Sequence, residues 1–255
     1  MKELCSLLFE LSNEDRLNIL RELKKNPMKL SRISEKFNFT VPETARNLTR
    51  LTETALITKT ADGYFHLTPI GEASLQMIPS FEFISKNKNY FKNHTISALP
   101  SEYITSIGVF RKSEFVKGVT ETLFNAENMV REAKEFICIS VDQILASSLS
   151  LFVDAIERGV ELKKLMPRNA NIPSRIFTMA NDPAFDRAAR AKMLESRYLD
   201  KLDFVLFMSE KEVAGISFEN LEGAFDYGSF RTSNEAALKW TKSLFLHYWD
   251  RAKLV

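Results

Sequence analysis

One stretch, residues 40–57 (TVPETARNLTRLTETALI), constrains the fold of this chain more than any other. Thr40 precedes Glu43 by three positions, which is the spacing of a capping box at the start of a helix. Apolar residues then recur at helical intervals and form one stripe, made of Ala45, Leu48, Leu51 and Ala55. The pattern predicts an amphipathic helix that buries this stripe.

The polar residues of this helix lie off the stripe, and we expect them to face outward: Glu43, Arg46, Asn47 and Arg50. Arg and Asn side chains carry the donor and acceptor pairs that match guanine and adenine edges in the major groove of DNA. A merely solvated helix face is the alternative interpretation of such scattered polar groups. The segments on either side of the helix decide between the two.

Two shorter helices are predicted before this helix, over residues 13–23 and 29–37, and a β-hairpin is predicted after it. The hairpin strands, residues 57–60 and 64–67, flank Asp62-Gly63, a pair that favours a tight turn. Three helices followed by a hairpin form a winged helix-turn-helix. In that fold Arg46, Asn47 and Arg50 would contact bases. The DNA backbone would be met by Thr44, Lys59 and Tyr64.

The first 75 or so positions resemble the DNA-binding domain of ArsR-type prokaryotic repressors. The matching motifs are R-L-x-I-L in the first helix, N-L-x-R-L in the third, A-L-I before the hairpin and L-T-P-I-G after it. Metal-sensing members of that family carry cysteine pairs on the recognition helix, and this helix has none. Metal sensing is therefore not implied. Ala55 stands where the family usually has Gly.

The rest of the chain predicts an α/β domain. Residues 136–141 (FICISV) read as a strand, 143–158 as a helix and 160–166 as a second strand, which is a βαβ unit with parallel strands. A hairpin over 204–218 and a long closing helix over 234–252 follow. We assign residues 1–78 to a winged helix-turn-helix domain, 79–95 to a basic linker helix and 96–255 to an α/β effector domain.

This second half resembles the effector domain of a family of archaeal winged-helix regulators, usually named the methanogenesis-regulatory middle domain. The most specific matches are the F-D-Y segment at 225–227 and the ending W-x₄-F-x₂-Y-W-x-R-A. The resemblance implies a transcription regulator in the cytoplasm of a methanogen or related archaeon. It supplies no ligand residues.

No catalytic motif is found. The βαβ core is similar to the phospholipase D type of fold, whose chemistry needs His-x-Lys, and none of the three histidines (His66, His94, His247) has Lys two positions later. Cys5 and Cys138 are too far apart in sequence to form a zinc motif or a disulfide framework. We therefore expect no enzyme activity, no metal and no cofactor. No run of about 20 apolar residues indicates a membrane span.

A sensor pocket at the ends of the parallel strands is a further expectation, because ligands gather there in α/β sheets. Its predicted rim is a set of charged and phenolic residues: Asp142, Arg168, Arg197, Tyr198, Asp226 and Tyr227. Surface ion pairs explain the charged members equally well, and a packed core explains the tyrosines better.

The leading functional hypothesis is a regulator that binds double-stranded DNA as a homodimer and responds to a small-molecule or protein effector. The net charge of +2 requires any DNA-binding surface to be local. The helical spacing of Leu4, Leu7, Leu8 and Leu11 marks a dimer seam, or else a face that packs on its own domain. A phosphodiester-processing enzyme and a winged-helix module that binds only proteins are the alternatives.

Overall fold

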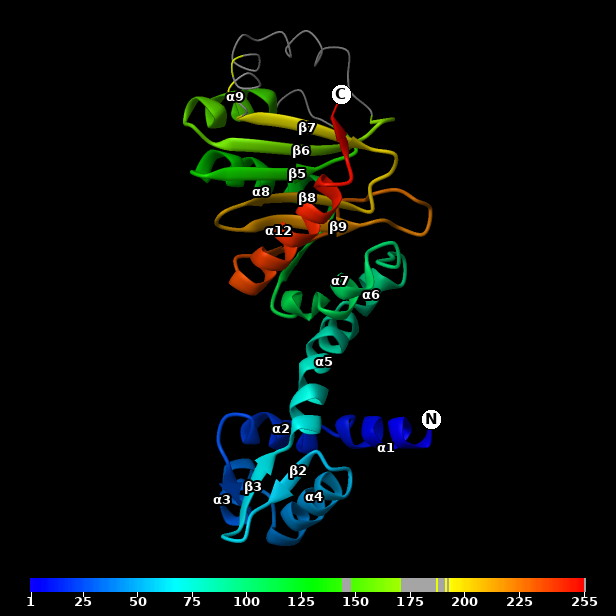
Figure 1. Ribbon diagram of the computed structural model, residues 1–255, viewed down its shortest axis with the longest axis vertical. Helices are drawn as coiled ribbons and strands as arrows, with labels where there is room; N and C mark the ends of the chain where they lie inside the picture. The colour runs from blue at the N-terminus through cyan, green and yellow to red at the C-terminus, as the bar shows by residue number, and fades with distance from the viewer. Residues whose placement is uncertain (144–147, 171–186, 188–190, 192, 255) are drawn as a thin grey trace. The chain divides into compact units, whose positions relative to one another are not determined.

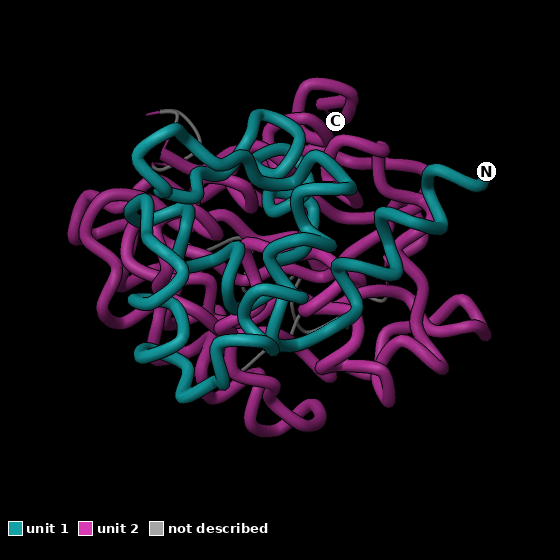
Figure 2. The backbone as a smooth tube through the Cα atoms, turned by 90° about the horizontal axis from the view of Figure 1, so that it is seen from below, with its two compact units in different colours: residues 1–79 teal, residues 80–255 magenta. Residues whose placement is uncertain are grey.

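The computed structural model describes residues 1–143, 148–170, 187, 191 and 193–254. The chain forms two compact units, Met1–Pro79 and Ser80–Val255 (Figure 2). The predicted α/β class is confirmed, since unit 1 is mainly helical and unit 2 is built on a large mixed sheet. The boundary between the units falls within one helix, α5 (Pro69–Lys86).

In unit 1 the three predicted helices and the hairpin occur in the order that the sequence predicts, and a further helix, α1, precedes them. Before α5 its elements are α1 (Lys2–Leu11), α2 (Glu14–Leu23), β1 (Met28–Lys29), α3 (Leu30–Phe37), α4 (Val41–Glu53), β2 (Ile57–Lys59) and β3 (Tyr64–Leu67). The strands form an antiparallel sheet in the order β1-β3-β2. The two-residue strand β1 has no signal of its own in the sequence, because it exists only by pairing with β3.

The helix boundaries of unit 1 follow from capping chemistry. The Asn13 side chain accepts a hydrogen bond from the Arg16 backbone N–H, and the Thr40 hydroxyl accepts one from the Glu43 N–H at 3.3 Å. At the end of α4 the Leu56 N–H reaches the Leu51 carbonyl oxygen, and Ala55 is left-handed with φ +56°. This is the Schellman geometry, in which Gly is the preferred residue.

Unit 2 is an eight-stranded sheet with helices on both faces (Figure 1). After α5 its described elements are α6 (Lys88–Phe91), α7 (Ser101–Thr105), the 3-10 helix η1 (Ile107–Phe110), β4 (Glu114–Val116), α8 (Gly118–Glu132), β5 (Phe136–Ser140), α9 (Leu149–Glu157), β6 (Glu161–Pro167), β7 (Leu194–Leu199), β8 (Phe204–Ser209), β9 (Val213–Phe218), β10 (Ser229–Thr232), α12 (Glu235–Trp249) and β11 (Lys253–Leu254). The strand order is β11-β7-β6-β5-β8-β9-β10-β4, and the predicted β5–α9–β6 unit is parallel.

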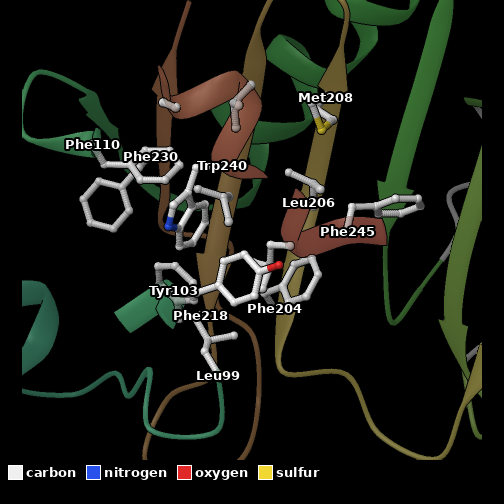
Figure 3. Packing of buried hydrophobic residues seen from close by; sticks show 14 of the residues in the cluster. Leu99, Tyr103, Phe110, Phe204, Leu206, Met208, Phe218, Phe230, Trp240 and Phe245 are labelled. Atoms are coloured by element: carbon white, nitrogen blue, oxygen red, sulfur yellow. The ribbon is translucent and has the colours of Figure 1, made fainter. Parts of the chain in front are cut away.

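Each face of this sheet has its own hydrophobic core. On one face α12 packs with α7 and η1, and Trp240 meets the rings of Phe110 and Tyr103 edge-on at 5.2 and 5.5 Å (Figure 3). On the other face α8 and α9 cover β5, β6 and β8, with Ile139 and Met166 buried between the layers.

Several predicted elements of unit 2 are wrong. Residues 79–95 do not form one linker helix: they hold the end of α5 and the short α6, and Phe83 and Tyr90 are buried in the α12-side core. Residues 114–132 form strand β4 and then helix α8, and Gly118 at φ +77° separates the strand from the helix. Strands β7 and β10 were not predicted. Their half-polar sequences, LESRYL and SFRT, lack the apolar run that identifies a buried strand.

Candidate nucleic-acid interface

The recognition helix candidate, α4, exposes a narrower face than the sequence suggested. Thr44, Asn47, Leu48 and Leu51 are buried, at i, i+3, i+4 and i+7, the standard spacing of a buried helix face. The exposed side chains of α4 are those of Val41, Pro42, Arg46, Thr49, Thr52 and Glu53. The apolar stripe predicted through Ala45 is therefore displaced by about one residue, since two polar residues stand at positions on the buried face.

Thr44 was expected to meet the DNA backbone, and this is wrong. The side chain is 0% exposed. Its hydroxyl lies 3.0 Å from the Thr40 carbonyl oxygen and 3.0 Å from the Ser34 hydroxyl. The contact with Ser34 joins α4 to α3, and the buried hydroxyl of Thr44 is not available to a phosphate.

Asn47 was expected to face outward, and this is also wrong, since only 6% of the residue is exposed. It shares the inner face of α4 with Leu48 and Leu51, which belong to the core of unit 1. A base edge cannot reach this side chain without unpacking the helix.

Arg50 is half-exposed but held by α1. Its guanidinium donates from Nη2 and Nε to the Glu10 carboxylate at 2.8 and 3.1 Å, and it lies 5.1 Å from the centre of the Phe9 ring. The hydrogen bonds to Glu10 raise the pKa of Arg50 above its usual value. The charge of Arg50 is thus paired within the protein. The sequence around Arg50 does not predict this pairing, because Glu10 lies 40 positions away.

Arg46 and the hairpin residues remain open to solvent. Arg46 is exposed, and the described residues place no carboxylate in contact with it. Lys59 and Tyr64, on neighbouring strands of the hairpin, are exposed as well. The Lys29 ammonium lies 4.9 Å from the centre of the Tyr64 ring, which places a third cation beside this hairpin.

A hollow of about 400 Å³ separates α4 from the hairpin. It is lined by Leu30, Ala45, Leu48, Thr49, Thr52, Glu53, Lys59 and Phe65. Thr49 and Thr52 on this surface were missed from the sequence. They follow Arg46 by three and six positions, so a helical wheel centred on Arg46, and not on Asn47, would have found them.

The six residues predicted as a ligand rim in unit 2 do not form one site. The Tyr227 hydroxyl donates to the Asp142 carboxylate at 2.7 Å, so these two are brought together. Asp226 instead faces His94, with 3.1 Å between carboxylate oxygen and Nε2.

The remaining three lie elsewhere in unit 2. Arg168 forms an exposed ion pair with Asp200. Arg197 and Tyr198 lie within β7: the guanidinium of Arg197 contacts Glu195 and the Trp249 carbonyl, and Tyr198 packs against the α9-side core. Residues 194–199 lack the apolar run that identifies a buried strand, so Arg197 and Tyr198 were predicted at a pocket rim and not within β7.

The described residues contain neither a candidate metal site nor a candidate membrane-spanning helix. They contain no group of three or more His, Cys, Asp or Glu side chains placed to hold a metal ion. Within the same ranges, no helix combines the length and apolar composition that a membrane crossing requires.

No family model matches the chain. The chain is 23% identical over 257 residues to the methanogenesis regulatory protein FilR1 of Methanothrix harundinacea (strain 6Ac). The match covers 95% of this chain and 56% of that protein, so the chain spans little more than half the length of this relative.

Among solved structures, TrmBL2, an archaeal chromatin protein with a novel mode of DNA binding, is similar at 18% identity, with a TM-score of 0.45 over 90% of this chain and 88% of that one. Nuc, a phospholipase D family member from Salmonella typhimurium, is similar at 11% identity and a TM-score of 0.40, over 56% of this chain and 98% of that one.

Proposed function

We propose that this chain is a DNA-binding transcription regulator in which α4 enters the major groove and the β2–β3 hairpin meets the flanking backbone. The observation that carries the proposal is the exposed cation Arg46 on α4, which contacts no carboxylate among the described residues and lies next to a hollow that ends at Lys59 of the hairpin. The name of the relative from Methanothrix harundinacea, a regulatory protein, supports the same function.

In this proposal the residues have different roles. Arg46 is the base-reading side chain, because a guanidinium binds the two acceptors of guanine bidentately. Thr49, one turn further along the exposed face, contacts the adjacent base or phosphate. Lys59 and Tyr64 contact phosphates, which position the protein without reading the sequence. Arg50, paired with Glu10, is excluded from base reading in this proposal.

The second part of the proposal is that the protein acts as a homodimer. In α1, Leu11 is buried and Leu7 packs on the core of unit 1, whereas Leu4 and Leu8 are 51% and 47% exposed. Leu4 and Leu8, one turn apart on one face of the helix, are the proposed seam. A dimer doubles the contacts by reading two half-sites. Light scattering at micromolar concentration tests it, and a mass of one chain would refute it.

The third part of the proposal is that unit 2 binds the small-molecule or protein effector. In α/β domains the usual place for such a ligand is a pocket at the ends of the parallel strands. Unit 2 is not proposed to turn the effector over, because no nucleophile with a positioned base is found among its described residues.

The DNA-reading test uses a duplex selected from a random library by the parent protein, and a scrambled duplex. Arg46→Ala should weaken binding to the selected duplex by about 5- to 150-fold and leave the scrambled duplex less affected. Lys59→Ala should weaken both duplexes alike and reduce the slope of log K against log salt by about one unit.

Two variants serve as controls. Arg131→Ala removes an exposed cation from α8 of unit 2 and should leave DNA affinity unchanged. Asn47→Ala should alter the melting temperature more than base preference, because its side chain is buried. If Arg46→Ala binds the selected duplex as tightly as the parent does, α4 does not read bases.

A further inference from the structure

A small cavity opens on the α8–α9 side of the unit 2 sheet, where strand β5 ends. Its volume is about 40 Å³. Its walls are apolar and come from the sheet and the helices that cover it: Leu123 of α8, Ile139 and Val141 from the end of β5, Phe207 of β8 and Phe152 of α9. A cavity that holds one water needs about 10–15 Å³, so this one accommodates about three to four non-hydrogen atoms.

Three polar side chains interrupt the apolar wall: Gln143, Ser148 and Tyr227. The Tyr227 hydroxyl donates to Asp142 at 2.7 Å, and Gln143 lines the cavity beside the same phenol. Burial, followed by the contact with Asp142, raises the pKa of Tyr227, so the phenol stays protonated and neutral. The described lining therefore offers hydrogen-bonding groups and no cation.

The position of Tyr227 is fixed by the surrounding structure. Its backbone is left-handed, with φ +61°, which is costly for a residue with a side chain. The Thr122 hydroxyl donates to its carbonyl oxygen at 2.8 Å and lies 2.8 Å from the Ser229 hydroxyl. A conformation held against its intrinsic preference at a cavity wall is typical of a functional site.

We propose that this cavity binds a small neutral molecule of about four non-hydrogen atoms that carries one amide or hydroxyl group, and that it is the site where unit 2 receives its signal. The apolar walls hold the carbon part of the ligand, while Ser148, Gln143 and the phenol oxygen of Tyr227 hold its polar group. A carboxylate ligand is disfavoured, because Asp142 stands behind the phenol and no cation among the described lining residues offsets the loss of hydration.

The neighbouring residue gives this site a route to the rest of unit 2. Asp226 faces His94, whose Nδ1 lies 2.9 Å from the Tyr90 carbonyl oxygen and whose ring stacks on that of Tyr90 at 3.8 Å. Tyr90 belongs to α6, which follows α5 directly. A ligand that hydrogen-bonds to Tyr227 is thus one residue from Asp226, which contacts the segment after α5. This signalling role rests on the proposed function, whereas ligand binding itself does not.

The test uses the full chain with labelled Ile, Leu and Val methyl groups and two isosteric probes, acetamide and acetate. Acetamide should give saturable shifts of the Ile139 and Val141 methyl signals. A ligand of four atoms binds no tighter than about 40 µM, so the titration runs to tens of millimolar. Acetate at the same concentrations should leave these signals in place.

Three variants make the result specific. Leu123→Trp fills the cavity from a half-exposed position and should abolish the acetamide shifts, while Phe124→Trp, its exposed neighbour, should not. Tyr227→Phe should weaken acetamide binding by about 2- to 10-fold through the lost hydrogen-bonding group. Tyr248→Phe removes the phenol of a second Tyr–Asp pair, 2.7 Å from Asp203 and outside the cavity, and should leave binding unchanged.

The proposal is overturned if acetamide gives no saturable shift, if acetate shifts the same methyl signals equally, or if Leu123→Trp still binds acetamide. DNA titrations of the same samples separate this result from the proposed function. Acetamide binding without selective DNA binding would refute the regulator and leave the ligand site standing, and the reverse outcome would refute the site alone.

Discussion

Replacing Glu10 by alanine should destabilise unit 1 and leave the stability of unit 2 unchanged. Glu10 is 5% exposed, at the end of α1, and its carboxylate lies 2.7 Å from Nε of Arg16, whose side chain is 8% exposed. The same carboxylate accepts from Arg50 of α4. One anion therefore links α1, α2 and α4, and its loss leaves the buried cation of Arg16 without a counter-charge.

The structure sets the size of the effect. Removing one partner of a buried ion pair costs about 3–5 kcal/mol, because the remaining charge stays desolvated. Arg16 would keep two acceptors, the backbone carbonyls of Phe9 and Glu10 at 3.1 and 3.2 Å, which places the expected loss near the lower end, about 3 kcal/mol. For a unit of 79 residues this lowers the melting temperature by about 12 °C or more. Arg50→Ala should lower the free energy of unfolding of unit 1 much less, because water screens the half-exposed ion pair between Arg50 and Glu10.

Two optical signals separate the units in a urea titration. Both tryptophans, Trp240 and Trp249, lie in α12 of unit 2, so tryptophan fluorescence reports unit 2, and far-ultraviolet circular dichroism reports both units. Glu10→Ala should move part of the dichroism transition to lower urea and leave the fluorescence transition in place. Glu3→Ala, on the same helix and exposed, is the matched control. If the two variants unfold alike, or if the fluorescence transition moves as far, the carboxylate does not hold unit 1 together.

The remaining predictions concern the backbone and the thiols. Ala55→Gly should stabilise unit 1 by about 0.5–1 kcal/mol, because Gly adopts the left-handed φ of +56° without steric cost. The same dichroism transition measures the change. If the transition does not move to higher urea, the backbone at Ala55 carries no strain. At pH 8 a disulfide reagent should modify one thiol per native chain, that of the exposed Cys5. Burial raises the pKa of Cys138 to about 12, so this thiol stays protonated and does not react. Fast modification of two thiols would contradict the burial of Cys138, and Cys5→Ser should abolish the fast reaction.

Local signals in the sequence were sufficient for most of unit 1. The capping residues Asn13 and Thr40 fix where α2 and α4 begin, and both accept the backbone hydrogen bonds expected of them. The Asp62-Gly63 turn fixes the hairpin. These features depend on contacts within a few residues, so the chain determines them before any tertiary packing. The βαβ unit of β5, α9 and β6 was predictable for the same reason, since strong apolar runs alternate with a helical pattern.

Tertiary structure decided which side chains are available for function. Thr44 and Asn47 are polar, yet they are buried because α3 and the core of unit 1 cover that side of α4. Arg50 is paired by a carboxylate 40 positions away, and the phenol of Tyr227 meets Asp142 across 85 positions. Such contacts leave no local pattern, because the residues are brought together only when distant elements pack. The sequence thus determined the helices and the hairpin of unit 1. Tertiary packing alone exposed Arg46, buried Asn47 and formed the cavity beside Tyr227.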